Sequence, residues 1–293
     1  MPRVWYVAIV GRPNAWKSTL LNALIWEKVS AISPRPQTTI RSVPGIFTDE
    51  GKELQIIFLD TPGIHETERE QFGSQKNEDI HTRINGEAFA SLREADVIVR
   101  LIDPTRPAGK EDERIDEVLS FSKKPILRVE TKQDLTQYAK TEWTDIIRVN
   151  SLTKEGFETL LEKIKEVLPE GPYLYDADQY TVQTIEFRAQ EIIREQLFQE
   201  LLEEIPYACF VEIGSIENHE TMISIQAYIN TETDSQKTVV IGKWWAKIQE
   251  IGTKSRLILE NIFGKKVFLG LRVKVMKNWR KDPNVIARLF PKK

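Results

Sequence analysis

Residues 11–18 of the 293-residue chain combine the residue types and the spacing of a phosphate-binding loop, Gly-x-x-x-x-Gly-Lys-[Ser/Thr], with one exception. In such a loop, backbone N–H groups and the N-terminus of the following helix surround a phosphate chain. The lysine reaches the outer phosphates and the hydroxyl group binds Mg²⁺, so we expect these roles for Lys17 and Ser18. The residues expected to hold the nucleotide phosphates are Gly11, Asn14, Ala15, Trp16, Lys17, Ser18 and Thr19.

The exception is Trp16, which stands where the loop has its second glycine. The backbone at this point passes close to the phosphates, often with a positive φ, so the missing Cβ of glycine matters. A side chain in the left-handed conformation costs about 1–2 kcal/mol, and an indole also competes with the nucleotide for space. The stretch therefore predicts a phosphate loop whose binding is weakened.

A carboxylate and a threonine follow in the order of the metal-binding elements of a GTPase. Asp60-Thr61-Pro62-Gly63 comes directly after the apolar run Leu54–Leu59, and Gln37-Thr38-Thr39 lies between it and the phosphate loop. We expect Ser18, Thr39 and Asp60 to bind Mg²⁺, and Lys17, Thr39 and the Gly63 N–H to stabilise charge on the γ-phosphate. Taken alone, Asp-Thr-Pro-Gly is also a common turn.

Thr131-Lys132-Gln133-Asp134 follows the apolar run Pro125–Val129 and matches the guanine-binding pattern Asn-Lys-x-Asp at two positions. In that pattern the aspartate accepts hydrogen bonds from the guanine edge and the lysine packs over the base. Thr131 replaces the asparagine, and we expect guanine preference to survive because Rho-like GTPases use the same replacement. Ser151 and Leu152 stand where a base-contacting loop belongs. The alternative for Thr131–Asp134 is a solvated loop of charges.

Short apolar runs alternate with helical segments through residues 1–168, which predicts a mostly parallel sheet with helices on both faces. Ligands of such sheets bind at the carboxyl ends of the strands, where the phosphate loop would lie. The predicted strands are Trp5–Val10, Val43–Thr48, Leu54–Leu59, Val97–Ile102, Pro125–Val129 and Ile146–Val149, and the predicted helices include Ser18–Ile25 and Lys154–Leu168.

A linker over residues 169–179 begins with Pro-Glu-Gly-Pro, and the pattern changes in residues 180–293. The order helix, two strands, two helices and strand predicts a smaller α+β domain. Its predicted elements are Thr181–Glu204, Ala208–Ile213, Met222–Ile229, the short piece Thr238–Ile241, Ala246–Phe263 and Val267–Val275.

The net charge of −3 hides an asymmetry between the two ends of the chain. Fifteen Lys and Arg against three acids give residues 237–293 a charge of +12, so the other 236 residues carry −15. A cationic segment behind an acidic body favours a polyanionic partner for that end; a basic tail kept for solubility is the alternative. The single cysteine, Cys209, fits a reducing cytoplasm, and we expect no integral membrane segment because no long apolar run is present.

In the order of these motifs the chain resembles the bacterial Era family of GTPases over nearly its whole length. The resemblance implies a P-loop GTPase domain followed by a type II KH domain that binds small-subunit ribosomal RNA during assembly of the 30S subunit. It also implies GTP and GDP as ligands with Mg²⁺, K⁺ bound through Asn14, and slow turnover, since Ile64 follows the Asp60–Gly63 motif in place of a glutamine. A monomer is the default expectation, and peripheral membrane association stays open.

KH domains clamp a nucleotide backbone with a Gly-x-x-Gly loop between two helices. The matching stretch is Gly242-Lys243-Trp244-Trp245, in which the first glycine is present and the last is tryptophan. Stacking of bases on an exposed tryptophan is worth about 1–3 kcal/mol per base, although the clamp geometry would differ. The residues expected to contact RNA are Gly242, Lys243, Trp244, Trp245, Lys247, Trp279 and Arg280. An exposed aromatic bump without a partner is the alternative for the tryptophan pair, and a C-terminal cap is the alternative for Trp279 and Arg280.

The chain departs from the family pattern in two ways. Trp16, Trp26 and Trp245 stand at positions where the family has glycine. In addition, three predicted central strands contain arginines, at positions 100, 128 and 148, and an unpaired buried guanidinium is costly. Both departures support the hypothesis of a sequence engineered or otherwise altered without regard to its sites. A pseudo-GTPase that keeps the fold and binds RNA weakly or not at all is the alternative to a working switch.

Overall fold

A computed structural model describes residues 1–33, 35, 39–63, 80–138 and 143–290. The chain divides into two compact units. The first comprises residues 1–30 and 39–182, and the second comprises residues 31–38 and 183–293. Gln37, Thr38 and Ile64, which figure in the sequence analysis, lie outside the described residues.

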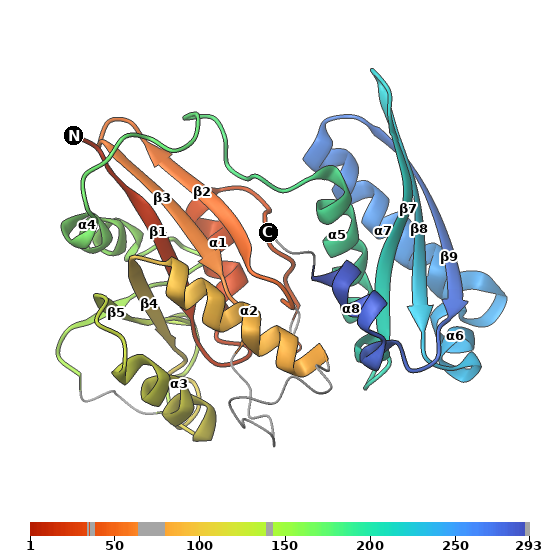
Figure 1. Ribbon diagram of the computed structural model, residues 1–293, viewed down its shortest axis with the longest axis horizontal. Helices are drawn as coiled ribbons and strands as arrows, with labels where there is room; N and C mark the ends of the chain where they lie inside the picture. The colour runs from red at the N-terminus through yellow and green to blue at the C-terminus, as the bar shows by residue number, and fades with distance from the viewer. Residues whose placement is uncertain (34, 36–38, 64–79, 139–142, 291–293) are drawn as a thin grey trace. The chain divides into compact units, whose positions relative to one another are not determined.

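The first unit contains a six-stranded sheet with the strand order β2-β3-β1-β4-β5-β6 (Figure 1). Every neighbouring pair is parallel except β2 and β3, which are antiparallel. The sheet confirms the predicted mostly parallel architecture. Its strands are β1 (Arg3–Val10), β2 (Val43–Asp49), β3 (Leu54–Asp60), β4 (Val97–Ile102), β5 (Ile126–Glu130) and β6 (Ile146–Arg148).

Helices cover both faces of this sheet, because its central strands are apolar on both sides and need two cores. Helices α1 (Lys17–Ile25) and α4 (Phe157–Val167) share one core with the strands, which includes Leu20, Val99 and Ile164. Helices α2 (Ile80–Glu94) and α3 (Lys110–Ser120) share a second core that includes Ile98 and Ile115 (Figure 1). This layering leaves the carboxyl ends of the strands free to carry loops.

The three strand arginines all pair with carboxylates. Arg100 in β4 is 2% exposed and lies 2.9 Å from both Asp112 and Asp116, which are presented one turn apart by α3. The guanidinium of Arg128 lies 3.4 Å from Asp145, and that of Arg148 lies 3.0 Å from Glu130. Since each arginine has its partner, they no longer support the hypothesis of an altered sequence.

Arg148 lies on β6, at the end of the strand order, and its Nε is 3.0 Å from the buried carboxylate of Glu130 on β5. The side chain of Arg148 is more than half exposed. A strand at the edge of a sheet can present a charged side chain to water while its backbone pairs on one side. The sequence analysis expected a central strand here, and the edge position explains the arginine.

Residues 169–182 pack along the first unit by backbone and side-chain hydrogen bonds. Pro169 and Pro2 carbonyl groups accept from Val4 and Gly171, respectively, and the Tyr180 carbonyl accepts from Ile46. These bonds attach the stretch after α4 to the sheet.

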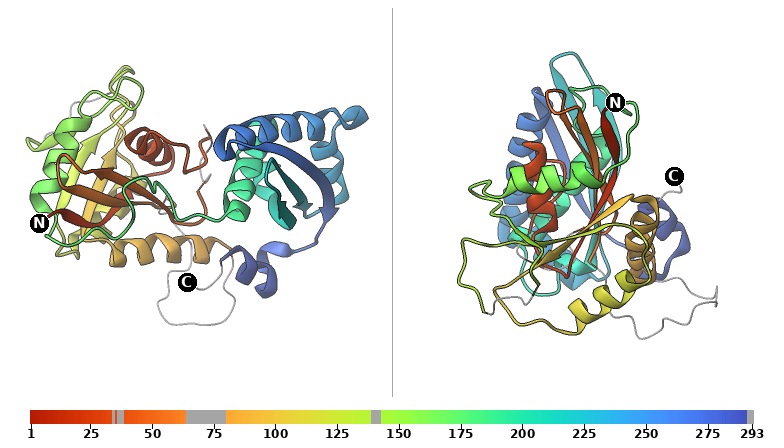
Figure 2. Two further views of the ribbon diagram at one scale, coloured as in Figure 1. Left: turned by 90° about the horizontal axis from the view of Figure 1, so that it is seen from above. Right: turned by 90° about the vertical axis from the view of Figure 1, so that its left-hand side faces the viewer.

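The second unit is a three-stranded sheet with the order β7-β8-β9, antiparallel between β7 and β8 and parallel between β8 and β9. Its strands are β7 (Cys209–Asn218), β8 (Met222–Thr231) and β9 (Lys266–Val275), and its helices are α5 (Ile185–Glu200), α6 (Asp234–Ile241), α7 (Ala246–Phe263) and α8 (Pro283–Leu289). Helices α5, α6 and α7 lie against this sheet (Figure 2). They contribute Ile193, Val240 and Ile251, respectively, to the core that they share with it. The order β8-α6-α7-β9, in which β9 returns beside β8 and pairs with it in parallel, confirms the predicted α+β domain of KH type.

Within the described residues, no helix is both long and apolar enough to cross a lipid bilayer.

Candidate functional site

The phosphate loop connects the end of β1 to the first residue of α1. Gly11 is tightly enclosed, because a Cβ there would lie 3.1 Å from the Cβ and carbonyl oxygen of Leu101. The Lys17 ammonium donates to the Gly11 carbonyl at 3.0 Å and the Arg12 carbonyl at 3.1 Å. Lys17 is 7% exposed, and burial lowers its pKa to about 8, against a smaller opposing effect of Asp60. The loop therefore holds its lysine in place through its own carbonyl groups.

Three hydroxyl groups converge on one oxygen of Asp60, at the carboxyl end of β3. Asp60 Oδ2 accepts from Ser18 at 2.5 Å, from Ser30 at 2.6 Å and from Thr39 at 3.3 Å. Ser18 and Thr39 Oγ atoms lie 3.1 Å apart. The sequence analysis expected Ser18, Thr39 and Asp60 to lie together, and the structure brings them together. It missed Ser30, for which no motif gives a signal.

The other carboxylate oxygen, Asp60 Oδ1, is buried and has no hydrogen-bond partner in the described part of the chain. Burial raises the pKa of Asp60, and the three hydroxyl donors and Lys17 oppose that rise only in part. An unpaired buried oxygen is costly, and carboxylate and hydroxyl oxygens are ligands that Mg²⁺ accepts. These residues therefore fit a Mg²⁺ ion. Among the described residues there is no cluster of three or more His, Cys, Asp or Glu that would offer another site.

Gly63 lies against the phosphate loop. A Cβ at this residue would lie 3.0 Å from Cγ of Pro13 and 3.3 Å from its backbone nitrogen. The segment that begins at Asp60 therefore contacts the phosphate loop three residues later, at Gly63.

The residues expected to bind guanine approach the phosphate loop from β5. Thr131 is buried, and its hydroxyl donates to the Ala15 carbonyl at 3.3 Å. The Lys132 ammonium lies 5.2 Å from the centre of the Trp16 ring, while Asp134 is exposed. The indole therefore occupies space beside the lysine that is expected to pack over a base.

The loop after β6 contributes the remaining residues expected near a base. Asn150 Oδ1 accepts from the backbone N–H groups of Leu152 at 2.9 Å and Thr153 at 3.3 Å, which fixes a tight turn. Ser151 is buried, and its hydroxyl has no partner among the described residues. The Leu152 side chain is exposed. Ser151 thus offers an unused polar group at this edge of the sheet.

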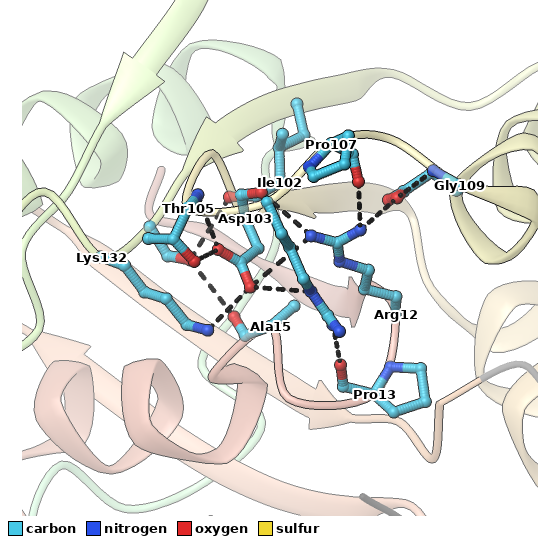
Figure 3. Close-up of polar contacts among 12 residues, drawn as sticks. Arg12, Pro13, Ala15, Ile102, Asp103, Thr105, Pro107, Gly109 and Lys132 are labelled. Atoms are coloured by element: carbon cyan, nitrogen blue, oxygen red, sulfur yellow. Dashed lines mark hydrogen bonds and ion pairs between the residues drawn. The ribbon is translucent and has the colours of Figure 1, made fainter. Parts of the chain in front are cut away.

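Asp103, at the carboxyl end of β4, connects the two ends of the site and was missed by the sequence analysis (Figure 3). Its Oδ2 accepts from Lys132 at 2.7 Å and lies 3.7 Å from the guanidinium of Arg12 and 3.4 Å from that of Arg106. Arg106 also donates to the Pro13 carbonyl at 2.9 Å. Burial would raise the pKa of Asp103, but hydrogen bonds from Lys132 and its neighbours outweigh it, so the pKa is lowered. A carboxylate at a strand end was the available signal.

Four tryptophans have left-handed backbone conformations. Trp16 precedes α1 with φ 62° and ψ 34°, and Trp26 follows α1 with φ 68° and ψ 13°. Trp244 and Trp245 precede α7 with φ 55° and 67°. Each costs about 1–2 kcal/mol relative to glycine, because the Cβ meets the adjacent carbonyl oxygen. The positive φ expected at position 16 is confirmed.

The loop between α6 and α7 contains the residues expected to clamp RNA. Gly242 has φ 73°, and a Cβ there would lie 2.6 Å from Cβ of Lys247. Trp244 and Trp245 are 84% and 63% exposed. Lys243 is exposed, whereas Lys247 is paired with Glu250 at 2.8 Å and Glu200 at 3.4 Å. Lys243 is therefore the more available cation of the loop.

Trp279 does not lie where the sequence analysis expected it. It is 2% exposed, its Nε1 donates to the Ala208 carbonyl at 3.1 Å, and its ring centre lies 4.6 Å from that of Phe210. A buried ring cannot stack on a base, so the expectation of stacking is wrong for this residue. Arg280 donates to the Tyr207 carbonyl at 2.9 Å and lies 3.6 Å from Glu232. Both residues act as a cap on the second unit, the alternative that the sequence left open.

Comparisons with known proteins agree with this architecture. Residues 6–132 match the family described as 50S ribosome-binding GTPase, and residues 204–280 match the KH domain family. GTPase Era of Borrelia garinii subsp. bavariensis is 39% identical over 97% of this chain and 98% of its own length. GTPase Era of Thermoanaerobacter sp. is 37% identical over 97% of this chain and 95% of its own.

Two solved structures match nearly the whole length of the chain. An Aquifex aeolicus Era variant bound to GDP and aluminium fluoride superimposes with a TM-score of 0.88 at 36% identity, covering 99% of both chains. Era in complex with MgGDPNP and nucleotides 1506–1542 of 16S ribosomal RNA does so with a TM-score of 0.89 at 36% identity, again over 99% of both chains. With near-complete coverage of its relatives at this identity, the chain belongs to the GTPase Era family.

Proposed function

We propose that this protein is a guanine-nucleotide-dependent switch that binds small-subunit ribosomal RNA and assists assembly of the 30S subunit. The observation that carries the proposal is the convergence of Ser18 and Thr39 on Asp60 beside the lysine of the phosphate loop. Three sequence-distant segments meet there in the arrangement a magnesium-bound nucleotide needs. The Era relatives solved with GDP and with MgGDPNP support the same ligand for this site.

The nucleotide phosphates lie along the loop and the N-terminus of α1, where backbone N–H groups and the Lys17 ammonium neutralise them. Lys17 exchanges its two loop carbonyls for phosphate oxygens, which also restores the charge that burial disfavours. Asp134 accepts from the guanine edge, and Lys132 packs over the base. The residues assigned to the nucleotide are Gly11, Asn14, Ala15, Trp16, Lys17, Ser18, Thr19, Asp60, Gly63, Thr131, Lys132, Asp134, Ser151 and Leu152.

Ser18, Thr39 and Asp60 would hold Mg²⁺, which would supply positive charge to neutralise the phosphates. The chain's own residues supply the rest. Lys17 balances charge that develops on the γ-phosphate, and the Gly63 N–H donates to the same group. Asn14, whose backbone is left-handed at φ 60°, is the residue we assign to K⁺. Thr39 and Gly63 sense the γ-phosphate, so its loss releases both segments.

Ribosomal RNA binds through the loop at residues 242–245, which lies within the cationic C-terminal segment. The exposed Lys243 pairs with phosphates, and Gly242 allows the close approach of an RNA backbone. The Era structure containing nucleotides 1506–1542 of 16S ribosomal RNA supports this class of partner. We further propose that the protein acts as a cytoplasmic monomer, with functional domains at residues 1–168 and 180–293 joined by a linker.

A second candidate is a scaffold that binds RNA and holds nucleotide poorly. The specific observation behind it is the Trp16 ring beside Lys132. A titration with a fluorescent GTP analogue separates the two functions. The switch predicts a Kd below about 1 mM, equivalent to about −4 kcal/mol, and a dependence on Mg²⁺ that Asp60→Asn removes. No binding up to that concentration rejects the switch for a chain with tryptophan at position 16.

RNA binding is tested on the full chain with a short single-stranded RNA at several salt concentrations. Lys243→Ala should weaken binding and reduce the slope of log K against log salt by about one. Lys265→Ala is the matched control, because Lys265 follows the other end of α7 and already donates to Asn218 and the His219 carbonyl. Equal slopes for the two variants contradict a phosphate contact by Lys243.

A further inference from the structure

Tryptophan and left-handed backbone coincide in this chain far more often than the residue type explains. Four of the seven tryptophans have positive φ, whereas only six residues of all other non-glycine types do so in the described part of the chain. Two of those six are asparagines, Asn14 and Asn278, a type that tolerates this region. A large aromatic residue is a genuine outlier there.

The tryptophan that ends α1 has the same backbone geometry as the glycine that ends α7. Trp26 ends α1 with φ 68° and ψ 13°, and its N–H donates to the carbonyl four residues earlier at 2.9 Å. Gly264 ends α7 with φ 62° and ψ 18°, and its N–H makes the same bond at 3.0 Å. This is the helix ending that glycine dominates. The two caps are equivalent in geometry and differ only in the side chain.

The tryptophans before α1 and α7 also have a glycine counterpart. Trp16 (φ 62°, ψ 34°) and Trp245 (φ 67°, ψ 8°) precede their helices with left-handed backbone, as Gly156 does before α4 with φ 78° and ψ −4°. Trp244, with φ 55° and ψ 32°, adds a second left-handed residue in the same turn. The phosphate loop and the KH loop are both defined by glycines at such points.

Trp279 has the environment that is typical of a tryptophan in a folded protein. It lacks a positive φ, is buried, and its indole N–H donates to a carbonyl group. Trp26, Trp244 and Trp245, in contrast, are 70%, 84% and 63% exposed. Of these five tryptophans, Trp16 included, four have a backbone conformation typical of glycine and one, Trp279, does not.

We propose that positions 16, 26, 244 and 245 are glycine in the protein that the source cell makes, because the codon at each of them is UGA and that cell decodes UGA as glycine. UGA is read as tryptophan under one variant of the genetic code and terminates translation under the standard one. A single decoding rule explains one type of replacement at separate places in both units. Independent substitutions at functional loops would produce several residue types. Trp279 is then encoded by UGG.

Two measurements test the proposal on the gene and on the native protein. Sequencing the gene should show UGA at the four positions and UGG at position 279. Tandem mass spectrometry of the protein purified from the source cells should show glycine at the four positions and tryptophan at 279, which serves as the internal control. Tryptophan at any of the four positions, or UGG as its codon, overturns the proposal. The same spectra report positions 5 and 143, where φ gives no signal.

This inference does not rest on the proposed function, since mass identifies each residue directly. A chain produced with glycine at all four positions then tests function separately. Failure of that chain to bind guanine nucleotide would reject the switch and leave the decoding result standing.

Discussion

Replacing Trp16 with glycine should tighten binding of guanine nucleotide at least tenfold. The residue is the N-cap of α1, in the turn that would surround the phosphates, and its ring lies 5.2 Å from the Lys132 ammonium. Removing the ring opens the space beside this lysine and allows the backbone to approach a phosphate oxygen. Tenfold corresponds to about 1.4 kcal/mol, which is within the range of one steric conflict relieved.

The same substitution should change stability much less. Glycine at position 16 removes about 1–2 kcal/mol of strain from the left-handed backbone of the folded state. It also makes the unfolded chain more flexible, which lowers the free energy of unfolding by about 0.4–1 kcal/mol. The contact between Lys132 and the ring is worth about 0.5–1 kcal/mol and is also lost. The free energy of unfolding should therefore change by about 1 kcal/mol or less, so a change in affinity cannot be attributed to folding.

Trp26→Gly is the matched control for this experiment. Trp26 has almost the same backbone angles, stands at the opposite end of the same helix, and also has a lysine over its ring, Lys154 at 3.1 Å. It should alter stability as Trp16→Gly does and leave affinity for nucleotide unchanged. Titration with a fluorescent GTP analogue and urea denaturation measure the two quantities. An unchanged affinity for Trp16→Gly, or an equal gain for both variants, refutes the steric argument.

Three further substitutions and one pH series probe the charged groups of the first unit. Asp103→Asn should lower the free energy of unfolding by about 3 kcal/mol, because it leaves the buried Lys132 ammonium without its anion, whereas Arg12 keeps its ion pair with Asp112 at 2.8 Å. Urea denaturation should show less than about 1 kcal/mol for Asp145→Asn, whose pair with Arg128 is exposed. Because burial lowers the pKa of Lys17 from 10.5 to about 8, the folded chain binds fewer protons than the unfolded chain between those values, and stability should rise with pH across that window. Below pH 8, the free energy of unfolding of Lys17→Met should exceed that of the parent protein by roughly 3 kcal/mol. This difference should shrink as pH rises toward 10.5, because the parent lysine then loses its charge. Denaturation curves in which the difference stays constant with pH contradict the burial of a charged lysine.

The sequence predicted both domains because their apolar periodicity and turn residues are local signals. It began two helices too early. One is α4, which begins at Phe157 and not at Lys154. Lys154 and Gly156 both have positive φ and cannot be helical. Likewise α5 begins at Ile185, because the Thr184 hydroxyl accepts from the Phe187 N–H and caps the helix there.

Site residues could be predicted from the sequence where a local motif identifies their role. They could not be predicted where their role depends on partners distant in the sequence. The order and spacing of Ser18, Thr39 and Asp60 in the chain predict that they bind the same metal ion. Asp103 looks like an ordinary acid before a proline, and only the fold brings it to Arg12 and Lys132. Periodicity marks Arg100 as a conflict, and it cannot show that two carboxylates on α3 face that strand.

The position of Asp103 has a consequence for how mutations combine. One carboxylate anchors the phosphate loop through Arg12 and the base-contacting loop through Lys132 (Figure 3). Loss of either cation frees the carboxylate to reorganise around the other, so their effects should be strongly non-additive. A double-mutant cycle with Arg12→Met and Lys132→Met should therefore reveal a coupling energy of about 0.5–3 kcal/mol. Such a value means that the stability contributions of the two loops depend on each other.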